Sequence, residues 1–205
     1  MRWWLLCVAL VPLSASPAWA CGNGKVLLSD SFDTLQPMWG DATDFVKVVD
    51  GRLQLSEADG KSYSIYAGLT FDDMDICAKI RLVQTDKVSG AYAGLMFWAK
   101  DLDNFYTFQI TLDGYATVYQ QVDNEWKALI KDRQVDSIHQ GTVRFNEIEV
   151  VTRGHQATFY INGERFDDIS GLEPDGGQHI GFTVEAPEGG HAVFVADDLQ
   201  VLEAP

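Results

Sequence analysis

The chain has 205 residues, of which 46% are hydrophobic and 12% aromatic, a composition typical of a folded globular protein. There are 30 acidic residues and only 15 basic ones, which leaves a formal charge of −15 at pH 7. Because no basic stripe is present to displace counterions, this charge argues against nucleic acid as a partner and against docking on anionic lipid. Its simplest consequence is solubility.

The first 20 residues have the pattern of a secretory signal peptide. A positive start at Arg2 precedes an apolar run over residues 3–13, and the segment ends in Ala18-Trp19-Ala20, which has the A-x-A form of a cleavage site. The apolar run is too short to span a bilayer, and no later stretch of the sequence approaches that length. We therefore expect an exported protein, periplasmic or secreted, whose mature chain forms one domain over residues 21–205.

Two cysteines, Cys21 and Cys77, remain in the expected mature chain. In an oxidising compartment two thiols favour one disulfide between them. The alternative is a lipid anchor on Cys21, because a lipoprotein signal also ends directly before a cysteine. A lipobox has Leu three residues before that cysteine and a small residue two before it. This chain has Ala18 and Trp19 at those positions, so the match is poor.

From residue 26 onward, short runs rich in β-branched and aromatic residues alternate with turn clusters at near-regular spacing. In chain order, strands are expected at residues 26–28, 45–49, 52–55, 74–83, 91–99, 105–110, 115–119, 125–130, 146–152, 156–161, 177–184 and 191–201. Asp50-Gly51 and Asn162-Gly163 are hairpin signals, and the second is expected to form a type I′ turn. The pattern predicts a single-domain, all-β sandwich.

Alternation along each strand assigns its two faces. Over residues 91–99, Leu95 and Phe97 are expected in the core, which places Trp98 on the outward face. On the returning strand, Phe108 is expected in the core and Gln109 on the outward face. Trp98 and Gln109 are therefore candidates for a concave outer surface.

The run from Gly94 to Ile110, GLMFWAKDLDNFYTFQI, resembles a recurring segment of concanavalin A-like jelly-roll domains. These domains include the laminin G-like modules and the family named for 3-keto-disaccharide hydrolases. The Glu125-Trp126 pair and the closing run over residues 194–201 fit the same pattern, and the resemblance covers nearly all of the expected mature chain. It implies an antiparallel, two-sheet jelly roll. Because this fold carries lectins, glycosidases and adhesive modules alike, the fold does not decide the activity.

Aromatic residues on a concave sheet can stack on sugar rings, while neighbouring amides bond the sugar hydroxyls. The candidates are Trp98, Tyr92, Tyr119 and Trp126, with Gln109 beside them. The competing interpretation is that these rings pack in the core or under a loop. If these rings stack on sugars, the protein is a non-catalytic module that binds carbohydrate through that face. The alternative ligand of the same face is an envelope or secreted protein.

No catalytic motif can be assigned in the sequence. The resemblance implies that a glycosidase of this fold would carry E-x-D-x-x-E or E-x-D-x-E, and Glu147-Ile-Glu149 lacks both the intervening Asp and the third acid. The histidines form no zinc-binding spacing, and no G-x-S-x-G elbow is present. A binding module is therefore expected. The alternative is a hydrolase or lyase acting on a 3-keto glycoside, with no catalytic residue assigned.

Four aspartates lie near the two ends of the expected domain, namely Asp30, Asp33, Asp197 and Asp198. If the terminal strands pair, these carboxylates can share one structural Ca²⁺. The alternative is that they form turns and place charge on sheet edges, which discourages aggregation. The sequence has no loop with the ligand spacing of an EF-hand, and no other cofactor is expected.

Overall fold

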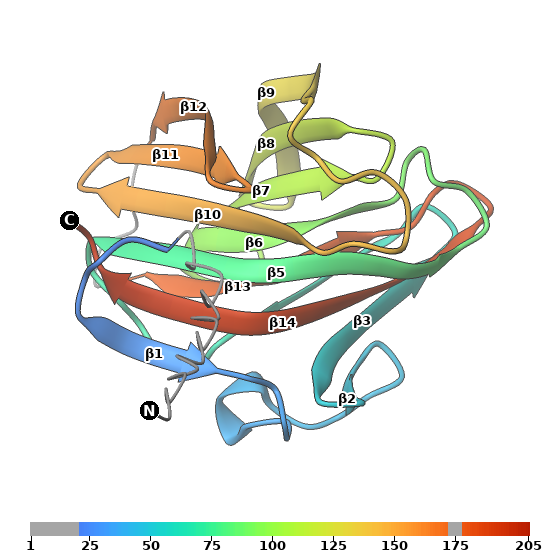
Figure 1. Ribbon diagram of the computed structural model, residues 1–205, viewed down its shortest axis with the longest axis horizontal. Coiled ribbons are helices and arrows are strands. Elements are labelled where there is room, and N and C mark those ends of the chain that lie inside the picture. The colour runs from blue at the N-terminus through green and yellow to red at the C-terminus, as the bar shows by residue number, and fades with distance from the viewer. Residues whose placement is uncertain (1–20, 172–177) are drawn as a thin grey trace, which may run out of the picture.

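A computed structural model describes residues 21–171 and 178–205. The described chain forms two antiparallel sheets packed face to face, so the expected all-β sandwich is confirmed. In Figure 1, strands β5, β10 and β14 of one sheet lie in front of β6 and β13 of the other. The expected signal peptide, residues 1–20, lies outside the described residues.

The larger sheet has eight strands, and its main path runs β12-β11-β10-β5-β14-β3-β2. Strand β1 pairs with the C-terminal part of β14, where Asp30 lies opposite Leu199, so the terminal strands pair as expected. The strands are β1 (Val26–Asp30), β2 (Val46–Val49), β3 (Arg52–Ala58), β5 (Met74–Thr85), β10 (Asn146–Arg153), β11 (Gln156–Ile161), β12 (Glu164–Ser170) and β14 (His191–Glu203).

The smaller sheet has six strands in the order β4-β13-β6-β7-β8-β9. They are β4 (Ser62–Tyr66), β6 (Tyr92–Ala99), β7 (Phe105–Thr111), β8 (Tyr115–Val122), β9 (Glu125–Gln134) and β13 (His179–Glu185). One 3₁₀ turn, η1 (Pro37–Trp39), precedes β2. Within the described residues, no helix has the length and apolar character needed to cross a membrane.

The core fills the space between the two sheets. Phe108 of the smaller sheet packs on Phe159 of the larger one, with ring centroids 4.8 Å apart, and neither ring is exposed. Ile76 and Ile80 of β5 point into this core, as their alternation predicts. Each strand therefore has one buried face and one outer face.

Hairpin turns were predicted well, whereas the polar edge strands were not. Asp50-Gly51 and Asn162-Gly163 both have two consecutive residues at positive φ, which confirms the type I′ geometry of the second turn. Strands β4 and β12 were not among the expected strands. Asp167 and Asp168 lie in β12. Both strands are edge strands with few apolar residues. Strand β12 lacks the alternation that reveals a strand, and β4 alternates over too short a run to stand out.

The expected disulfide is present. Cys21 is bonded to Cys77 of β5, and the two Cα atoms are 5.9 Å apart. The bond ties the first described residue to the outer face of the larger sheet. A sulfur engaged in this bond is not available for the thioether of a lipid anchor.

Candidate functional site

The outer face of the six-stranded sheet carries four of the five residues predicted to bind a ligand. Tyr92 of β6, Gln109 of β7, Tyr119 of β8 and Trp126 of β9 all point to this face, since Leu95, Phe108 and Val118 of the same strands point to the core. We call this surface the outer face. It brings together side chains that lie far apart in the sequence.

Trp98 does not lie on the outer face, so its prediction was wrong. Its ring is 1% exposed and lies in the core against Phe97 and Tyr106. The reason is a bulge: between Met96 and Ala99, β6 has one more residue than the facing segment Gly181 to His179 of β13. Trp98 takes a left-handed backbone with φ of 45°, so the alternation breaks and two successive rings point inward.

The floor of the outer face is made of short polar side chains. Thr107, Gln109 and Thr183 are each at most 3% exposed although they point away from the core. Gly94 lies between Gln109 and Thr183 across the strands and adds no side chain. Within the described part of the chain, the side-chain amide of Gln109 makes no hydrogen bond and Oγ1 of Thr107 has no partner. Gln109 thus forms a floor rather than a projecting hydrogen-bonding group.

A cavity of about 320 Å³ shows that the outer face is concave. Its walls include Ser62 and Ser64 of β4 and Trp126 of β9, which are the two edge strands of the sheet. Both edges can line one cavity only if the sheet curves toward its outer face. Phe105 and Gln121 complete the end of the cavity nearest Trp126.

Trp126 is the most accessible ring of the face, with 46% of its surface exposed. Phe105 and Tyr119 meet it edge-on, with ring centroids 5.5 and 6.1 Å away. These contacts hold the indole in place while part of it stays in solvent. Burial on the same face raises the pKa of Tyr119, and the charge of Asp132 adds to this effect. The Tyr119 hydroxyl is therefore neutral at physiological pH and can donate a hydrogen bond.

The opposite end of the outer face is acidic. The Tyr92 hydroxyl donates a 3.2 Å hydrogen bond to Oδ1 of Asp132 on β9. Burial and the charge of Asp132 raise the pKa of Tyr92 far above its ordinary value. Glu185 of β13 lies opposite Tyr92, and burial followed by the charge of Asp132 raises its pKa as well. Asp132 and Glu185 were not among the predicted residues, because no motif links two positions 53 residues apart (185 − 132 = 53).

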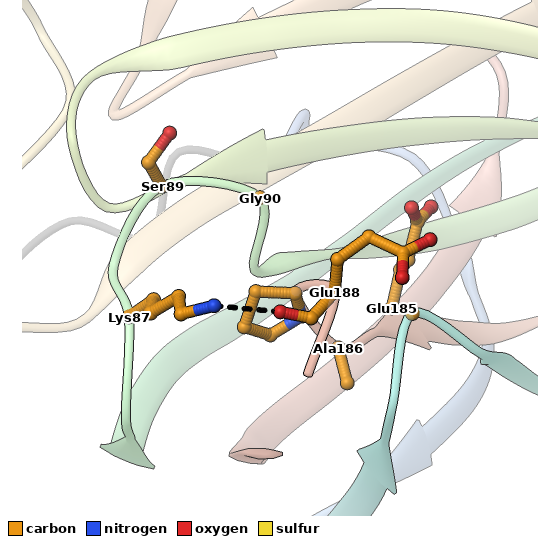
Figure 2. A pocket seen from close by; sticks show the side chains of 8 residues that line it. Lys87, Ser89, Gly90, Glu185, Ala186 and Glu188 are labelled. Atoms are coloured by element: carbon orange, nitrogen blue, oxygen red, sulfur yellow. Dashed lines mark hydrogen bonds between the residues drawn. The ribbon is translucent and has the colours of Figure 1, made fainter. Parts of the chain in front are cut away.

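Two adjoining hollows extend this acidic end. One of about 250 Å³ is lined by Tyr92, Asp113 and Asp132, and it shares Ser89 and Gly90 with a second hollow of about 280 Å³. Figure 2 shows the second hollow, where Glu185 and Glu188 lie together and Lys87 lies on the other side. The Lys87 ammonium donates a 2.7 Å hydrogen bond to the Glu188 carbonyl oxygen.

The four aspartates expected to share Ca²⁺ are bonded to different partners. Asp30 is buried and accepts 2.8 Å bonds from the Phe32 amide and the Trp39 indole. Asp33 accepts a hydrogen bond from Ser31.

The other two aspartates form ion pairs, Asp197 with Arg52 at 3.1 Å and Asp198 with Lys79 at 2.6 Å. Within residues 21–171 and 178–205, no three His, Cys, Asp or Glu side chains gather as a metal site. In this structure Asp30 therefore caps a turn and Asp33 bonds a neighbouring hydroxyl, while Asp197 and Asp198 pair with cationic side chains.

No family model and no curated protein matches the chain. Several solved structures share its fold. The carbohydrate-binding module CBM66 from Bacillus subtilis has a TM-score of 0.59 and 16% identity, covering 73% of this chain and 86% of that one.

A Bacillus subtilis protein of unknown function with a galectin-like fold has a TM-score of 0.61 and 13% identity over 89% and 98% of the two chains. A Bacteroides ovatus mixed-linkage glucan GH16 structure has a TM-score of 0.61 and 13% identity over 86% and 100%. Identity this low speaks for the fold alone. The chain has the fold of a two-sheet jelly-roll sandwich, similar to that of concanavalin A-like domains.

Proposed function

We propose that the protein is an exported module that binds carbohydrate on the concave outer face of its six-stranded sheet. The observation that carries this proposal is Trp126, a 46% exposed indole that lies at the rim of a concave cavity and is held there by two other rings. An aromatic ring that is already ordered loses little conformational freedom when a sugar ring stacks on it.

The surrounding polar groups fit a sugar rather than an apolar ligand. Ser62, Ser64 and Gln121 line the cavity that Trp126 borders, and they offer two hydroxyl groups and an amide oxygen to sugar hydroxyls. Solved structures with the same fold include a carbohydrate-binding module and a carbohydrate recognition domain from Emp47p, which supports the proposal.

The charge of the face narrows the class of sugar. Asp113, Asp132, Glu185 and Glu188 line the hollows at its acidic end. A uronate or a sulfated sugar would meet like charge there, which costs binding free energy. The ligand class favoured by these residues is therefore a neutral or amino-bearing glycan.

A glycan array probed with the exported protein tests this proposal, run once with Ca²⁺ and once with chelator. We expect binding to neutral glycans that Trp126→Ala and Tyr119→Ala each reduce at least tenfold. Val122→Ala is the matched control, since Val122 lies on the same hairpin with 45% exposure but points to the other side. Binding that Trp126→Ala and Val122→Ala reduce equally, or no glycan binding at all, would overturn the proposal.

A second candidate is a hydrolase or lyase that acts on a 3-keto glycoside. The observation that favours it is the pair of carboxyl groups beside Tyr92: Glu185 has the raised pKa of a general acid, and Asp132 is held by the Tyr92 hydroxyl. Incubation with 3-keto and ordinary glycosides, followed by mass spectrometry of the products, tests it. Turnover that Glu185→Gln abolishes supports catalysis, whereas absence of turnover with both classes rejects it.

A further inference from the structure

A second pocket, of about 210 Å³, lies on the outer face of the larger sheet, away from the proposed sugar site. Strands β5, β10 and β11 and the first described residues surround it, and its walls include Asp75, Glu149, Arg153, Tyr160 and Gly22. We call it the β5–β10 pocket. Nothing in the proposed carbohydrate function uses it.

Two buried carboxyl groups share the β5–β10 pocket. Asp75 is 1% exposed and Glu149 is 8% exposed. Oδ2 of Asp75 accepts a 2.9 Å hydrogen bond from the Gly22 amide, and the Asp75 and Glu149 carboxyl groups share a hydrogen bond, for which one of them must carry a proton. Apart from Glu149, no donor within the described residues reaches the buried Oδ1 of Asp75. Burial and the charge of Asp75 raise the pKa of Glu149 to about 8, and burial also raises the pKa of Asp75.

No cation compensates these two groups within the described ranges. Arg153 lines the pocket, yet it forms no ion pair with either carboxylate. The other ionisable side chains nearby are Glu147, whose charge also raises the pKa of Glu149, and Tyr160, and Pro205 also lines the pocket. At the end of β14, Glu203 is paired with Lys25. A pair that shares one proton still carries one negative charge, and burying that charge without a counter-ion is costly.

Cys21 places a backbone nitrogen beside this pair. Its side chain is fixed by the disulfide to Cys77, and Cys77 lies directly opposite Glu149 across β5 and β10. The nitrogen of Gly22 is already bonded to Asp75. By covalent geometry the Cys21 nitrogen lies within about 3.7 Å of that atom. As part of a peptide bond this nitrogen is neutral. If Cys21 is the first residue of the chain, the same nitrogen is an α-ammonium group.

We propose that the β5–β10 pocket is the binding site for the α-ammonium group of Cys21, which is released when the signal peptide is cleaved before that residue. Hydrolysis of the Ala20–Cys21 peptide bond consumes one water molecule and leaves a carboxylate on Ala20 and an amine on Cys21, which takes up a proton. The amine is then the cation that Asp75 and Glu149 lack. Maturation thus completes the N-terminal part of the fold, and this holds whether or not the outer face binds sugar.

The test uses the full chain exported from a bacterial host and purified in its mature form. Intact mass identifies the first residue. The pH dependence of acylation of the α-amine, followed on the N-terminal peptide, then measures its pKa. We expect a pKa about one unit above the ordinary value of about 7.7, because the two carboxylates favour the charged amine.

Two kinds of variant separate this proposal from a merely structural role. Glu149→Gln and Asp75→Asn should return the α-amine to its ordinary pKa, while Glu147→Gln, on the same face of β10, should leave the shift in place. One alanine inserted between Ala20 and Cys21 keeps every side chain and the disulfide but moves the amine away, and it should abolish the shift. The proposal would be overturned by a first residue other than Cys21 or by an ordinary α-amine pKa in the natural protein. It would also be overturned if the α-amine had the same pKa in Glu149→Gln and in Glu147→Gln.

Discussion

The ring of Trp98 meets the ring of Tyr106 edge-on inside the core, with centroids 5.2 Å apart and planes at 85°. Both rings are at most 5% exposed. A large aromatic residue at φ of 45° is rare, because its Cβ crowds the following backbone. Burial of the indole outweighs that cost, which is why the bulge of β6 persists.

Trp98→Ala should lower the free energy of unfolding by about 3–5 kcal/mol, the usual penalty for truncating a buried aromatic ring. Trp126→Ala should cost less than about 1 kcal/mol, because that ring is half exposed before the change. Urea denaturation of both variants and the natural protein measures the two costs. Equal losses would contradict the assignment of Trp98 to the core and of Trp126 to the surface.

Thr107→Val should leave stability unchanged or raise it by up to about 1 kcal/mol. The Thr107 hydroxyl is buried without a partner among the described residues, so removing it loses no hydrogen bond and removes a desolvated polar group. Valine has nearly the same shape and suits a strand. A loss above about 1 kcal/mol in a thermal or urea melt would mean that the hydroxyl has a partner. Thr183→Val is the contrasting variant, because Thr183 bonds the Ser64 hydroxyl at 3.1 Å.

Glu149 should make the stability of an N-terminally blocked chain fall with pH. Its pKa is about 8 in the folded protein against 4.5 in the unfolded chain, so the folded state binds more protons between those values. Its contribution is fully present below pH 4.5 and is lost as pH rises through 8.

Urea melts of the N-acetylated protein at several pH values measure this decline. Glu149→Gln should flatten it, and Glu147→Gln should not. In the mature chain with a free amine, the decline should be shallower, because the ammonium lowers the pKa of the carboxyl pair. An acetylated chain whose stability does not change between pH 5 and about 8 would contradict the burial of a protonated carboxyl.

Reduction of the Cys21–Cys77 bond should lower stability by roughly 2–4 kcal/mol. The two cysteines are 56 residues apart in sequence, and a cross-link of that length restricts the unfolded chain considerably. Cys77→Ala should match the reduced protein, and reductant should not change that variant further. A melting temperature insensitive to reductant, together with two free thiols by mass, would contradict the bond.

Local patterns in the sequence were sufficient for most of the fold. Strand alternation predicted the core face of β5, and two residues of suitable type predicted each hairpin turn. These features depend on neighbours along the chain, because the pleat has a period of two and a type I′ turn needs two residues that tolerate positive φ. Tyr92, Tyr119 and Trp126 were candidates by residue type, and the pairing of β6 to β9 places them on one face.

Tertiary structure alone decided the position of Trp98 and the composition of both pockets. The bulge that turns Trp98 inward depends on the register between β6 and β13, which are 80 residues apart (179 − 99 = 80), and one extra residue reverses every assignment beyond it. Asp75 and Glu149 became a pair because β5 and β10 are neighbours in the larger sheet. Their shared burial, rather than the identity of either residue, raises the pKa of Glu149, and burial is a property of the packed sheet.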